Sequence, residues 1–513
     1  MAAILDARTL PDGETVTPDL AIIGGGPAGI ALALALQSTA FTILLLEAGG
    51  NEFDAKVQDA YKGAADGETP YLTLDESRLR YFGGSSNHWG GWNRPLDAVD
   101  FEQRDWIAHS GWPFGIEALQ PYFAKAQALC EAGPWLYDQT PRRIPTGDAT
   151  LKLGDGGVYT SWFQFSKTQD GGLPTPFGKR YEAELKAAPR VTTWLHAAVT
   201  GLRQAPDARS IARLEVQAEG KRLTVKPRFT VLAGGALENA RLLLASNDVM
   251  KPGIGNQNDL VGRFFADHPI PRDVATLVLF NGQLPKGYFS GQGVNNALIL
   301  PDGTPVRAVF SPTMAFIRKE KVIGSLTTVE YPVPMTAPMG EAVAATTQML
   351  GVDASMARAY SLGCGLEPIP DPERRVTLGG ERDGLGMPRL KLHVTVPDTD
   401  FRLYRTTLRE LGRQLLASKA GLLRLNRASR PDWLAGMYQP KALPWWGSHH
   451  MGTTRMHADA KQGVVDVNSK VHGVANLFVA GSSVLPTYGS SNPTLNLLAL
   501  TLRLGDHLKT VLA

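Results

Sequence analysis

A glycine-rich turn near the N-terminus constrains the fold of this chain more than any other feature. Gly24, Gly26 and Gly29 form the pattern G-x-G-x-x-G between the apolar run "DLAIIG" and the helix-forming run "IALALALQS". A second apolar run, "FTILLLEAGG", contains Glu47, which lies 18 residues after the last glycine. These glycines permit a tight turn, close approach of a pyrophosphate, and packing of helix on strand. The N-terminus of the helix attracts phosphates, and the Glu47 carboxylate can accept hydrogen bonds from ribose hydroxyls. The stretch therefore predicts a β-α-β dinucleotide-binding unit. NAD and FAD both use this unit.

The uncharged stretch from Leu20 to Leu46 has the length of a transmembrane helix. The run "GGGPAG" in its middle instead suits a turn between two shorter elements. A signal peptide needs a basic segment before its apolar core, whereas the residues before Leu20 include four acids and one arginine. We therefore expect no transmembrane segment and a cytoplasmic protein, with export alongside a partner subunit left open.

Charge and cysteine content exclude some partners and ligands. The net charge of +3 over 513 residues gives no reason to expect a nucleic-acid partner. Cys130 and Cys364 lie far apart and match no metal-binding or disulfide pattern, which predicts buried free thiols. The histidines show no metal-ligand spacing either, so we expect no metal site.

Two later segments repeat the order of strand, glycine turn and helix. They cover residues 228–246, "RFTVLAGGALENARLLLAS", and residues 476–508. In the second segment, Asn492 is a good N-cap and Pro493 suits the first helical position. The region 267–446 contains short β-like runs with Pro and Gly breaks, such as "ATLVLF", "VRAVFSPTMAFI" and "LKLHVTV". The sequence therefore predicts an α/β fold (α+β overall), in which a nucleotide-binding sheet is assembled from distant segments around an inserted, sheet-rich domain.

These segments also suggest domain limits. We assign residues 17–100, 190–266 and 447–513 to a discontinuous nucleotide-binding domain. Residues 101–189 and 267–446 are assigned to a substrate-binding domain and its connecting segments. The chain shows no repeat of solenoid period and no low-complexity tract.

The stretch "RYFGGSSNHWGGWN" contains a small, flexible turn from Gly83 to Ser86, followed at once by His88 and Trp89. Small residues let the backbone approach a flat ring system closely, so that backbone N–H groups reach its edge atoms. A surface turn beside a packed tryptophan fits the same residues. The stretch by itself does not decide between these two interpretations.

Taken together, five motifs resemble those of the glucose-methanol-choline (GMC) family of FAD-dependent oxidoreductases. They are "IIGGGPAGIALALAL…LLLEAGG", "GGSSNHWGG", "VLAGGALENARLLLAS", "FADHP" (265–269), and "HHMGTTRM" followed by "NLFVAGSSVLPTYGSSNPTLN". Their order is that of the family, and they extend over most of the chain. Within the family, "GGxSxHW" and "NPT" are most similar to pyranose oxidases and to bacterial glycoside 3-oxidases or 3-dehydrogenases. The resemblance implies FAD rather than NAD, and a Rossmann-like FAD-binding domain with an inserted substrate domain, the p-hydroxybenzoate-hydroxylase-like architecture.

The same resemblance implies which residues bind FAD. Those expected at the ADP half are Gly24, Gly26, Gly29, Glu47 and Val199. Those expected at the flavin, ribityl and phosphate side are Gly83, Gly84, Ser85, Asn87, His88, Gly481, Ser482, Pro493 and Thr494. Ala48, Ala233 and Gly234 are also expected to bind the cofactor. His88 aligns with the histidine that pyranose oxidases link covalently to the flavin, a bond that related enzymes lack.

Oxidation of an alcohol by FAD requires a base for the hydroxyl proton, and histidine titrates in a suitable range. In the family motif "HxxGT" the first histidine is the base, and alignment on Gly452 and Thr453 places it at His449. The partner position, which is His or Asn in the family, falls on Asn492. If this segment is extended, adjacent side chains point to opposite faces, so that His450 faces away from the flavin and has a supporting role.

Other site residues and the substrate class are less constrained by the sequence. Trp445, Tyr488 and His450 are candidate substrate contacts, although packing roles suit the two aromatic residues equally well. A helix that begins at Pro493 would direct its N-terminus at the reduced flavin and stabilise negative charge there. We expect the substrate to be a small alcohol, foremost a secondary hydroxyl of a sugar or glycoside (C3 or C2), and the electron acceptor to be O2, a protein or a quinone. Oxidation of a non-sugar alcohol, a hydroxynitrile-lyase-like reaction and a flavin-binding assembly role stay open, as does the choice between oxidase and dehydrogenase.

Overall fold

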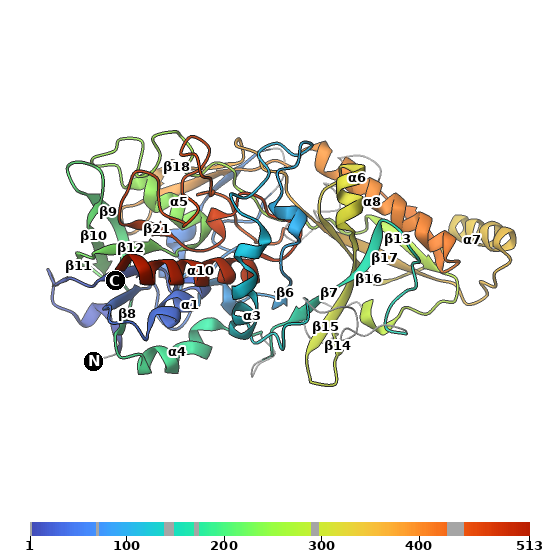
Figure 1. Ribbon diagram of the computed structural model, residues 1–513, viewed down its shortest axis with the longest axis horizontal. Helices are drawn as coiled ribbons and strands as arrows, with labels where there is room; N and C mark the ends of the chain where they lie inside the picture. The colour runs from blue at the N-terminus through green and yellow to red at the C-terminus, as the bar shows by residue number, and fades with distance from the viewer. Residues whose placement is uncertain are drawn as a thin grey trace.

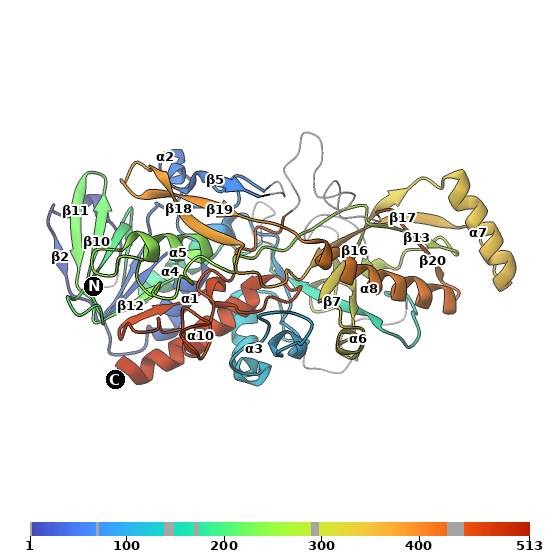
Figure 2. The same ribbon diagram turned by 90° about the horizontal axis from the view of Figure 1, so that it is seen from above.

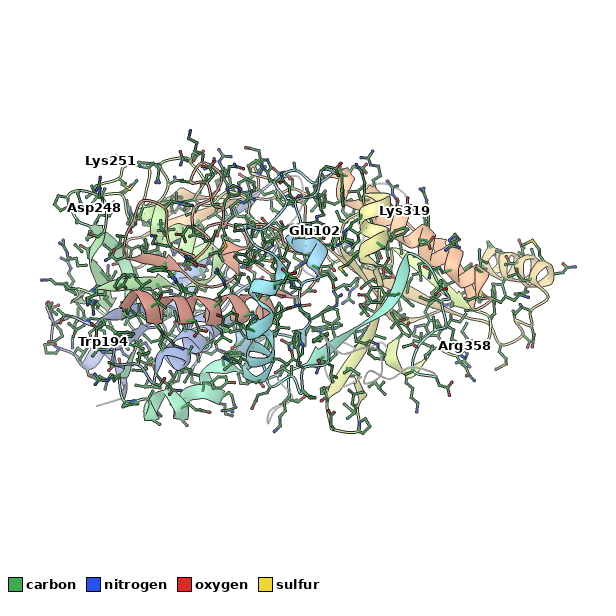
Figure 3. All side chains as sticks on the ribbon, viewed as in Figure 1. Glu102, Trp194, Asp248, Lys251, Lys319 and Arg358 are labelled. Atoms are coloured by element: carbon green, nitrogen blue, oxygen red, sulfur yellow. The ribbon has the colours of Figure 1, made fainter. Side chains whose placement is uncertain are left out.

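The computed structural model describes residues 3–67, 71–137, 148–168, 174–288, 297–427 and 446–512. The molecule is elongated, with a body of mixed helix and sheet at one end and a sheet-rich body at the other (Figure 1). Both chain termini lie in the first body. Trp194 belongs to this first body and Arg358 to the second, as the view with all side chains shows (Figure 3).

The first body is built on a six-stranded parallel sheet. Its strand order is β1 (Ala3–Asp6), β8 (Val191–Leu195), β4 (Ile43–Leu46), β3 (Leu20–Ile23), β12 (Phe229–Leu232) and β21 (Leu477–Val479). Each neighbouring pair is parallel, so strands from distant parts of the chain lie side by side. The central strands are almost entirely buried, which explains why they read as continuous apolar runs. The predicted α/β fold is confirmed.

Helices accompany this sheet. They are α1 (Pro27–Leu36), α2 (Ala55–Gln58), α3 (Gln120–Leu129), α4 (Phe177–Ala187), α5 (Gly235–Ala245) and α10 (Pro493–Leu512). Helix α1 packs against α10 and α4, and seven of its ten residues are buried, as its nearly uniform apolar sequence requires. Figure 1 shows α10 running alongside α1. No helix in the described ranges is both long and apolar enough to cross a membrane.

Two smaller sheets belong to this end of the molecule. One has the order β2 (Thr15–Val16), β11 (Lys221–Val225), β10 (Ile211–Ala218), β9 (Ala198–Gln204), and the other has the order β18 (Arg375–Arg382), β19 (Pro388–His393), β5 (Gly63–Asp66). The run "LKLHVTV" begins in β19. The sequence pattern identifies this strand but not its partner: it pairs with β5, and its hairpin partner β18 packs against α5 of the first body (Figure 2).

The second body contains an eight-stranded sheet. Its order is β20 (Gly421–Leu425), β13 (Ala275–Leu279), β17 (Arg358–Leu366), β16 (Ser325–Val333), β15 (Pro305–Pro312), β7 (Val158–Phe165) and β6 (Trp92–Asn93), with β14 (Leu298–Ile299) on β15. All of its strand pairs are antiparallel. Helix α8 (Asp398–Ala417) buries Phe401, Tyr404 and Leu408 and contacts β20 and β7, while α6 (Met314–Glu320) and α7 (Ala337–Leu350) complete the body. The sheet-rich character predicted for the inserted region is confirmed.

Two connections bring the bodies together around the glycine turns. Strand β6 follows directly after the "GGSSNHWGG" stretch and joins the second sheet through β7. Residues 266–269, which lead toward β13, pair antiparallel with residues 446–451. Ala266 and Met451 exchange backbone hydrogen bonds of 3.1 and 2.9 Å, and Gly447 N–H donates to the carbonyl of His268 at 3.0 Å. The two-histidine segment is therefore fixed against the "FADHP" segment.

Candidate active site

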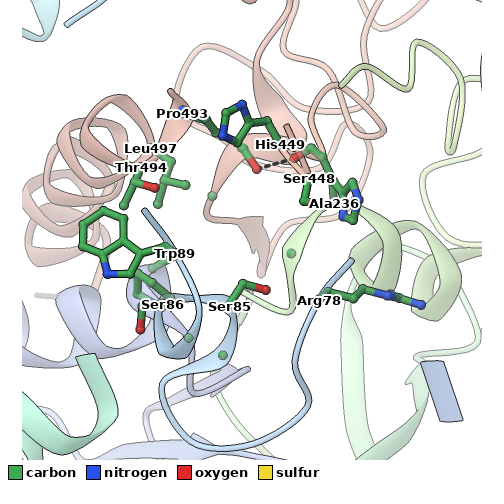
Figure 4. A pocket seen from close by; sticks show the side chains of 18 of the residues that line it. Arg78, Ser85, Ser86, Trp89, Ala236, Ser448, His449, Pro493, Thr494 and Leu497 are labelled. Carbon is green, nitrogen blue, oxygen red and sulfur yellow. Dashed lines mark hydrogen bonds between the residues drawn. The ribbon is translucent and has the colours of Figure 1, made fainter. Parts of the chain in front are cut away.

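A cavity of about 420 Å³ lies where these segments meet. His449 and Pro493 are on one side of it, and Ser85, Ser86 and Trp89 are on the facing side (Figure 4). The lining combines the turn after β3, the turn after β12, the glycine-serine turn, the two-histidine segment and the start of α10. Segments that are distant in sequence thus form one site.

Most of the residues expected at the cofactor line this cavity. They are Gly24, Gly26, Glu47, Gly84, Ser85, His88, Ala233, Gly234, Gly481, Ser482, Pro493 and Thr494. His449, Asn492 and His450 line it as well. The structure therefore brings both expected catalytic residues and most of the expected cofactor-binding residues to one place.

Five residues expected to bind the cofactor are not part of the described lining: Gly29, Ala48, Gly83, Asn87 and Val199. Two of them shape the turns instead. A Cβ at Gly29 would lie 1.9 Å from the carbonyl oxygen of Gly24, so only glycine lets α1 approach this turn. Asn87 donates from Nδ2 to the carbonyl of Phe82 at 3.0 Å and so stabilises the glycine-serine turn. Val199 is buried in β9.

The assignment of Tyr488 as a substrate contact is wrong in this structure. Its side chain is 1% exposed and its hydroxyl donates to the carbonyl of Phe264 at 2.7 Å. Tyr488 is therefore a buried packing residue whose hydroxyl is already hydrogen-bonded, and packing was the other role that the sequence allowed for it. Trp445, the other aromatic candidate, lies outside the described residues.

The glycine turn after β3 has the geometry of an anion-binding site. Gly24 has φ +114°, which favours glycine, and a Cβ there would lie 2.5 Å from the carbonyl oxygen of Ala233. Gly26 precedes α1 without a side-chain cap bond, so the N–H groups of the first turn are available to a ligand. Glu47 accepts from the backbone N–H of Gly25 at 2.8 Å and of Gly49 at 2.9 Å, which fixes its carboxylate beside the turn.

His449 has a hydrogen-bond partner at each ring nitrogen. Its Nε2 lies 3.0 Å from Nδ2 of Asn492, and its Nδ1 lies 2.8 Å from Nδ1 of His268. His268 in turn places Nε2 2.9 Å from the carbonyl oxygen of Gly489. Asn492 immediately precedes α10, so the start of this helix holds the side chain at His449.

Burial keeps these imidazoles neutral. It lowers the pKa of His449 well below the usual value, and the neighbouring His268 and His450 lower it further. Burial also lowers the pKa of His268 to about 4, against the opposing effects of the Gly489 carbonyl and of Glu367. Both rings are therefore uncharged at neutral pH, the state in which a histidine accepts a proton.

Asp267 anchors the backbone of the histidine segment. Its Oδ1 accepts from the N–H of His449 at 2.7 Å, and its Oδ2 accepts from the hydroxyl of Tyr71 at 2.6 Å. Burial raises the pKa of Asp267 to about 6, although these hydrogen bonds favour the charged form. The carboxylate fixes the backbone of His449 in space, and the hydrogen bonds of its ring then fix the orientation of the side chain.

His450 belongs to the cavity lining together with His449. Ser448, which precedes the pair, has φ +54°, so the backbone leaves the extended conformation just before His449. The ring of His450 lies against Tyr71 and Phe265, and burial lowers its pKa to about 3. Its Nε2 is buried and has no hydrogen-bond partner in the part of the chain that the structure describes. These surroundings suit a packing residue better than a proton acceptor.

Sequence reasoning missed several residues of this site, among them Asp267, His268, Arg78 and Trp92. Asp267 and His268 belong to the recognised motif "FADHP", but nothing in their spacing indicates that they contact a segment 181 residues away. Arg78 lines the cavity, pairs with Glu238 at 2.8 Å and lies over the ring of Tyr61. Trp92 also lines it. Its position next to "GGSSNHWGG" was the available signal.

The chain is similar to several proteins of known function. Residues 370–501 match the family described as GMC oxidoreductase. The chain is 24% identical to the fructose dehydrogenase large subunit of Gluconobacter japonicus, over 96% of this chain and 98% of that protein. It is 29% identical to the C-glycoside 3-oxidase of Microbacterium trichothecenolyticum, over 56% of this chain and 48% of that protein.

Solved structures share the whole fold. The structure titled pyridoxine 4-oxidase from Mesorbium loti superimposes with a TM-score of 0.57 and 18% identity, over 96% of this chain and 99% of the other. A formate oxidase superimposes with a TM-score of 0.58 and 18% identity, over 98% of this chain and 99% of the other. Residues 370–501 match the GMC oxidoreductase family, and the fructose dehydrogenase large subunit is similar to the chain over nearly its whole length.

Proposed function

We propose that this protein binds FAD and oxidises an alcohol to a carbonyl compound, with a sugar or glycoside as substrate. The observation that carries the proposal is the neutral ring of His449 in the cavity wall, with Nε2 directed at the amide of Asn492. This arrangement provides a proton acceptor next to a group that can hold the substrate oxygen.

The cavity suits FAD at both of its expected ends. A Cβ built at Gly26 meets no atom within 4 Å, so the N-terminus of α1 leaves space for a pyrophosphate next to Glu47. Pro493 and Thr494 line the cavity at the N-terminus of α10, where the helix dipole favours negative charge. When it is bound, FAD supplies the hydride acceptor, the N5 atom of its flavin.

The protein residues then account for the proton. The substrate hydroxyl replaces the Asn492 N–H as the donor to Nε2 of His449, and the proton moves to this atom as the hydride leaves the substrate carbon. Asn492 is then free to donate to the substrate oxygen. The N-terminus of α10 stabilises the negative charge that accompanies reduction.

The named relatives favour a carbohydrate. Fructose, a C-glycoside and a pyranose are named among them, and the last two names specify positions 3 and 2 of the ring. Trp89 and Trp92 line the cavity and are candidate contacts for a sugar ring. A non-sugar alcohol is the second candidate, because a 2-methyl-1,2-propanediol dehydrogenase and a 5-(hydroxymethyl)furfural oxidase each match over 96% of this chain.

An anaerobic screen tests this function. The FAD-loaded protein is mixed without oxygen with free sugars, O- and C-glycosides and aromatic alcohols, and the flavin absorbance is followed. We expect bleaching by at least one sugar or glycoside. Bleaching by aromatic alcohols alone would contradict the carbohydrate assignment, and no bleaching by any alcohol would contradict alcohol oxidation. Addition of O2, and separately of quinones or dyes, then identifies the acceptor.

We extend the proposal to a covalent bond between FAD and His88, in which a ring nitrogen would replace one hydrogen of a flavin methyl group, with the proton lost to solvent and the two electrons passed to the electron acceptor. His88 lines the cavity, and burial lowers its pKa, so its ring is neutral and nucleophilic. Acid precipitation of the wild-type protein is expected to retain the yellow flavin in the pellet, and His88→Ala is expected to release it. Flavin in the supernatant of the wild-type protein would show that the cofactor is held without a covalent bond.

A further inference from the structure

His268 has no role in the proposed mechanism, yet it makes the closest contact to the ring of His449. We infer that His268 is a positioning residue that holds His449 in the Nδ1–H tautomer, which makes Nε2 the atom that receives the substrate proton. This inference rests on the proposed function for its catalytic meaning, although the tautomer itself is a property of the resting protein.

The first step concerns His268 itself. Its Nε2 lies 2.9 Å from the carbonyl oxygen of Gly489, and a carbonyl oxygen only accepts hydrogen bonds. Nε2 of His268 must therefore carry a hydrogen. Since the buried ring is neutral, its Nδ1 carries a lone pair and is an acceptor.

The second step deduces which ring nitrogen of His449 carries the hydrogen. The two Nδ1 atoms are 2.8 Å apart, which is a hydrogen bond and requires one hydrogen between them. Because His268 is the acceptor, His449 carries the hydrogen on Nδ1 and a lone pair on Nε2. The amide Nδ2 of Asn492, 3.0 Å from this Nε2, is then a donor, and the three contacts are mutually consistent.

The third step excludes a proton relay. Gly489 offers a backbone carbonyl, which does not take up a proton, so a proton cannot leave His268 in that direction. His268 instead stabilises the imidazolium that forms at His449, because the Nδ1–H bond becomes charge-assisted when Nε2 is protonated. His268 thus orients the catalytic base by a hydrogen bond, as a carboxylate does in many other active sites.

His268 is held firmly enough for this role. Its side chain is 2% exposed, and its carbonyl accepts from the N–H of Gly447. The neighbouring Asp267 binds the backbone of His449. The groups that act on the two rings through charge are Glu367 at His268 and His450 at His449. His268 and His449 are thus held by backbone hydrogen bonds as well as by the hydrogen bond between their rings.

Two conservative variants separate the contacts of His268. In His268→Asn the amide oxygen replaces Nδ1 and retains the acceptor for His449. In His268→Gln the amide nitrogen replaces Nε2 and retains the bond to Gly489, but the acceptor is lost. We expect the rate constant of anaerobic flavin reduction to fall by about 10- to 100-fold in the Gln variant, the cost of a hydrogen bond to a charged group, and the Asn variant to recover most of this loss. FAD absorbance and circular dichroism control for folding.

The tautomer is measured directly by two-bond ¹H–¹⁵N correlation spectra of histidine-labelled protein, with His449→Ala to assign the signal. We expect the wild-type spectrum to show His449 protonated at Nδ1, and the Gln variant to lose this preference. A wild-type His449 protonated at Nε2, or a Gln variant as fast as the Asn variant, would overturn the inference. If no alcohol reduces the flavin, the proposed function fails, but the spectrum still decides the tautomer.

Discussion

His449→Ala is expected to lower the rate constant of anaerobic flavin reduction by about 10²–10⁴-fold, the usual contribution of a general base, while FAD stays bound. The reason is that the variant removes the lone pair at Nε2 that faces Asn492, and leaves the glycine turn and Glu47 unchanged. Stopped-flow mixing with the best substrate of the screen measures the rate, and the absorbance ratio of flavin to protein measures the FAD content.

His450→Ala is the matched control. It removes an adjacent histidine of the same cavity wall, whose ring lies against Tyr71 and Phe265. We expect this variant to keep part of its activity, because it loses packing rather than the proton acceptor. Equal and complete loss in both variants would undo the assignment of the base to His449.

Gly29→Ala is expected to destabilise the first body and to abolish FAD binding. Its new methyl group would lie 1.9 Å from the carbonyl oxygen of Gly24 and 3.2 Å from Cδ1 of Leu45, so α1 must move away from β3. Overpacking of this kind costs about 1–3 kcal/mol, and here the obstacle is backbone rather than a movable side chain. Thermal unfolding and the FAD content of the purified variant measure the two effects.

Gly26→Ala separates folding from cofactor binding. Gly26 has φ −81°, and a Cβ at this position has no neighbouring atom within 4 Å, so alanine fits the chain without strain. Its methyl group enters the space assigned to the pyrophosphate. We expect an unfolding temperature of the FAD-free protein close to that of the wild type, and weakened FAD binding. Wild-type FAD affinity in this variant would contradict the placement of the pyrophosphate.

Most of the first body could be predicted because its signals are local. The apolar runs at β3 and β4 and the glycines between them are read within about thirty residues. The positive φ of Gly24 and the close approach at Gly29 explain why glycine is needed at these positions. The partner of β19 could not be predicted, because nothing in its own sequence distinguishes pairing with β5 from pairing within the larger sheet.

The two-histidine segment was likewise predictable only in part. The motif singled out His449 and its partner Asn492, and the structure places the two side chains in contact. The sequence did not indicate that the ring of His450 packs against Tyr71 and Phe265, because these residues come from other segments of the chain.

By itself, the sequence predicted the parallel sheet, the glycine turn after β3, the resemblance to GMC oxidoreductases and the candidate base, since each depends on residue types at short, fixed spacing. Only the tertiary structure decided which atom of His449 is free to accept a proton. That choice depends on His268 and, through it, on the carbonyl of Gly489, and these residues meet His449 only when the chain is folded. Hydrogen-bond direction is set by pairs of atoms in space, so no spacing along the chain reveals it.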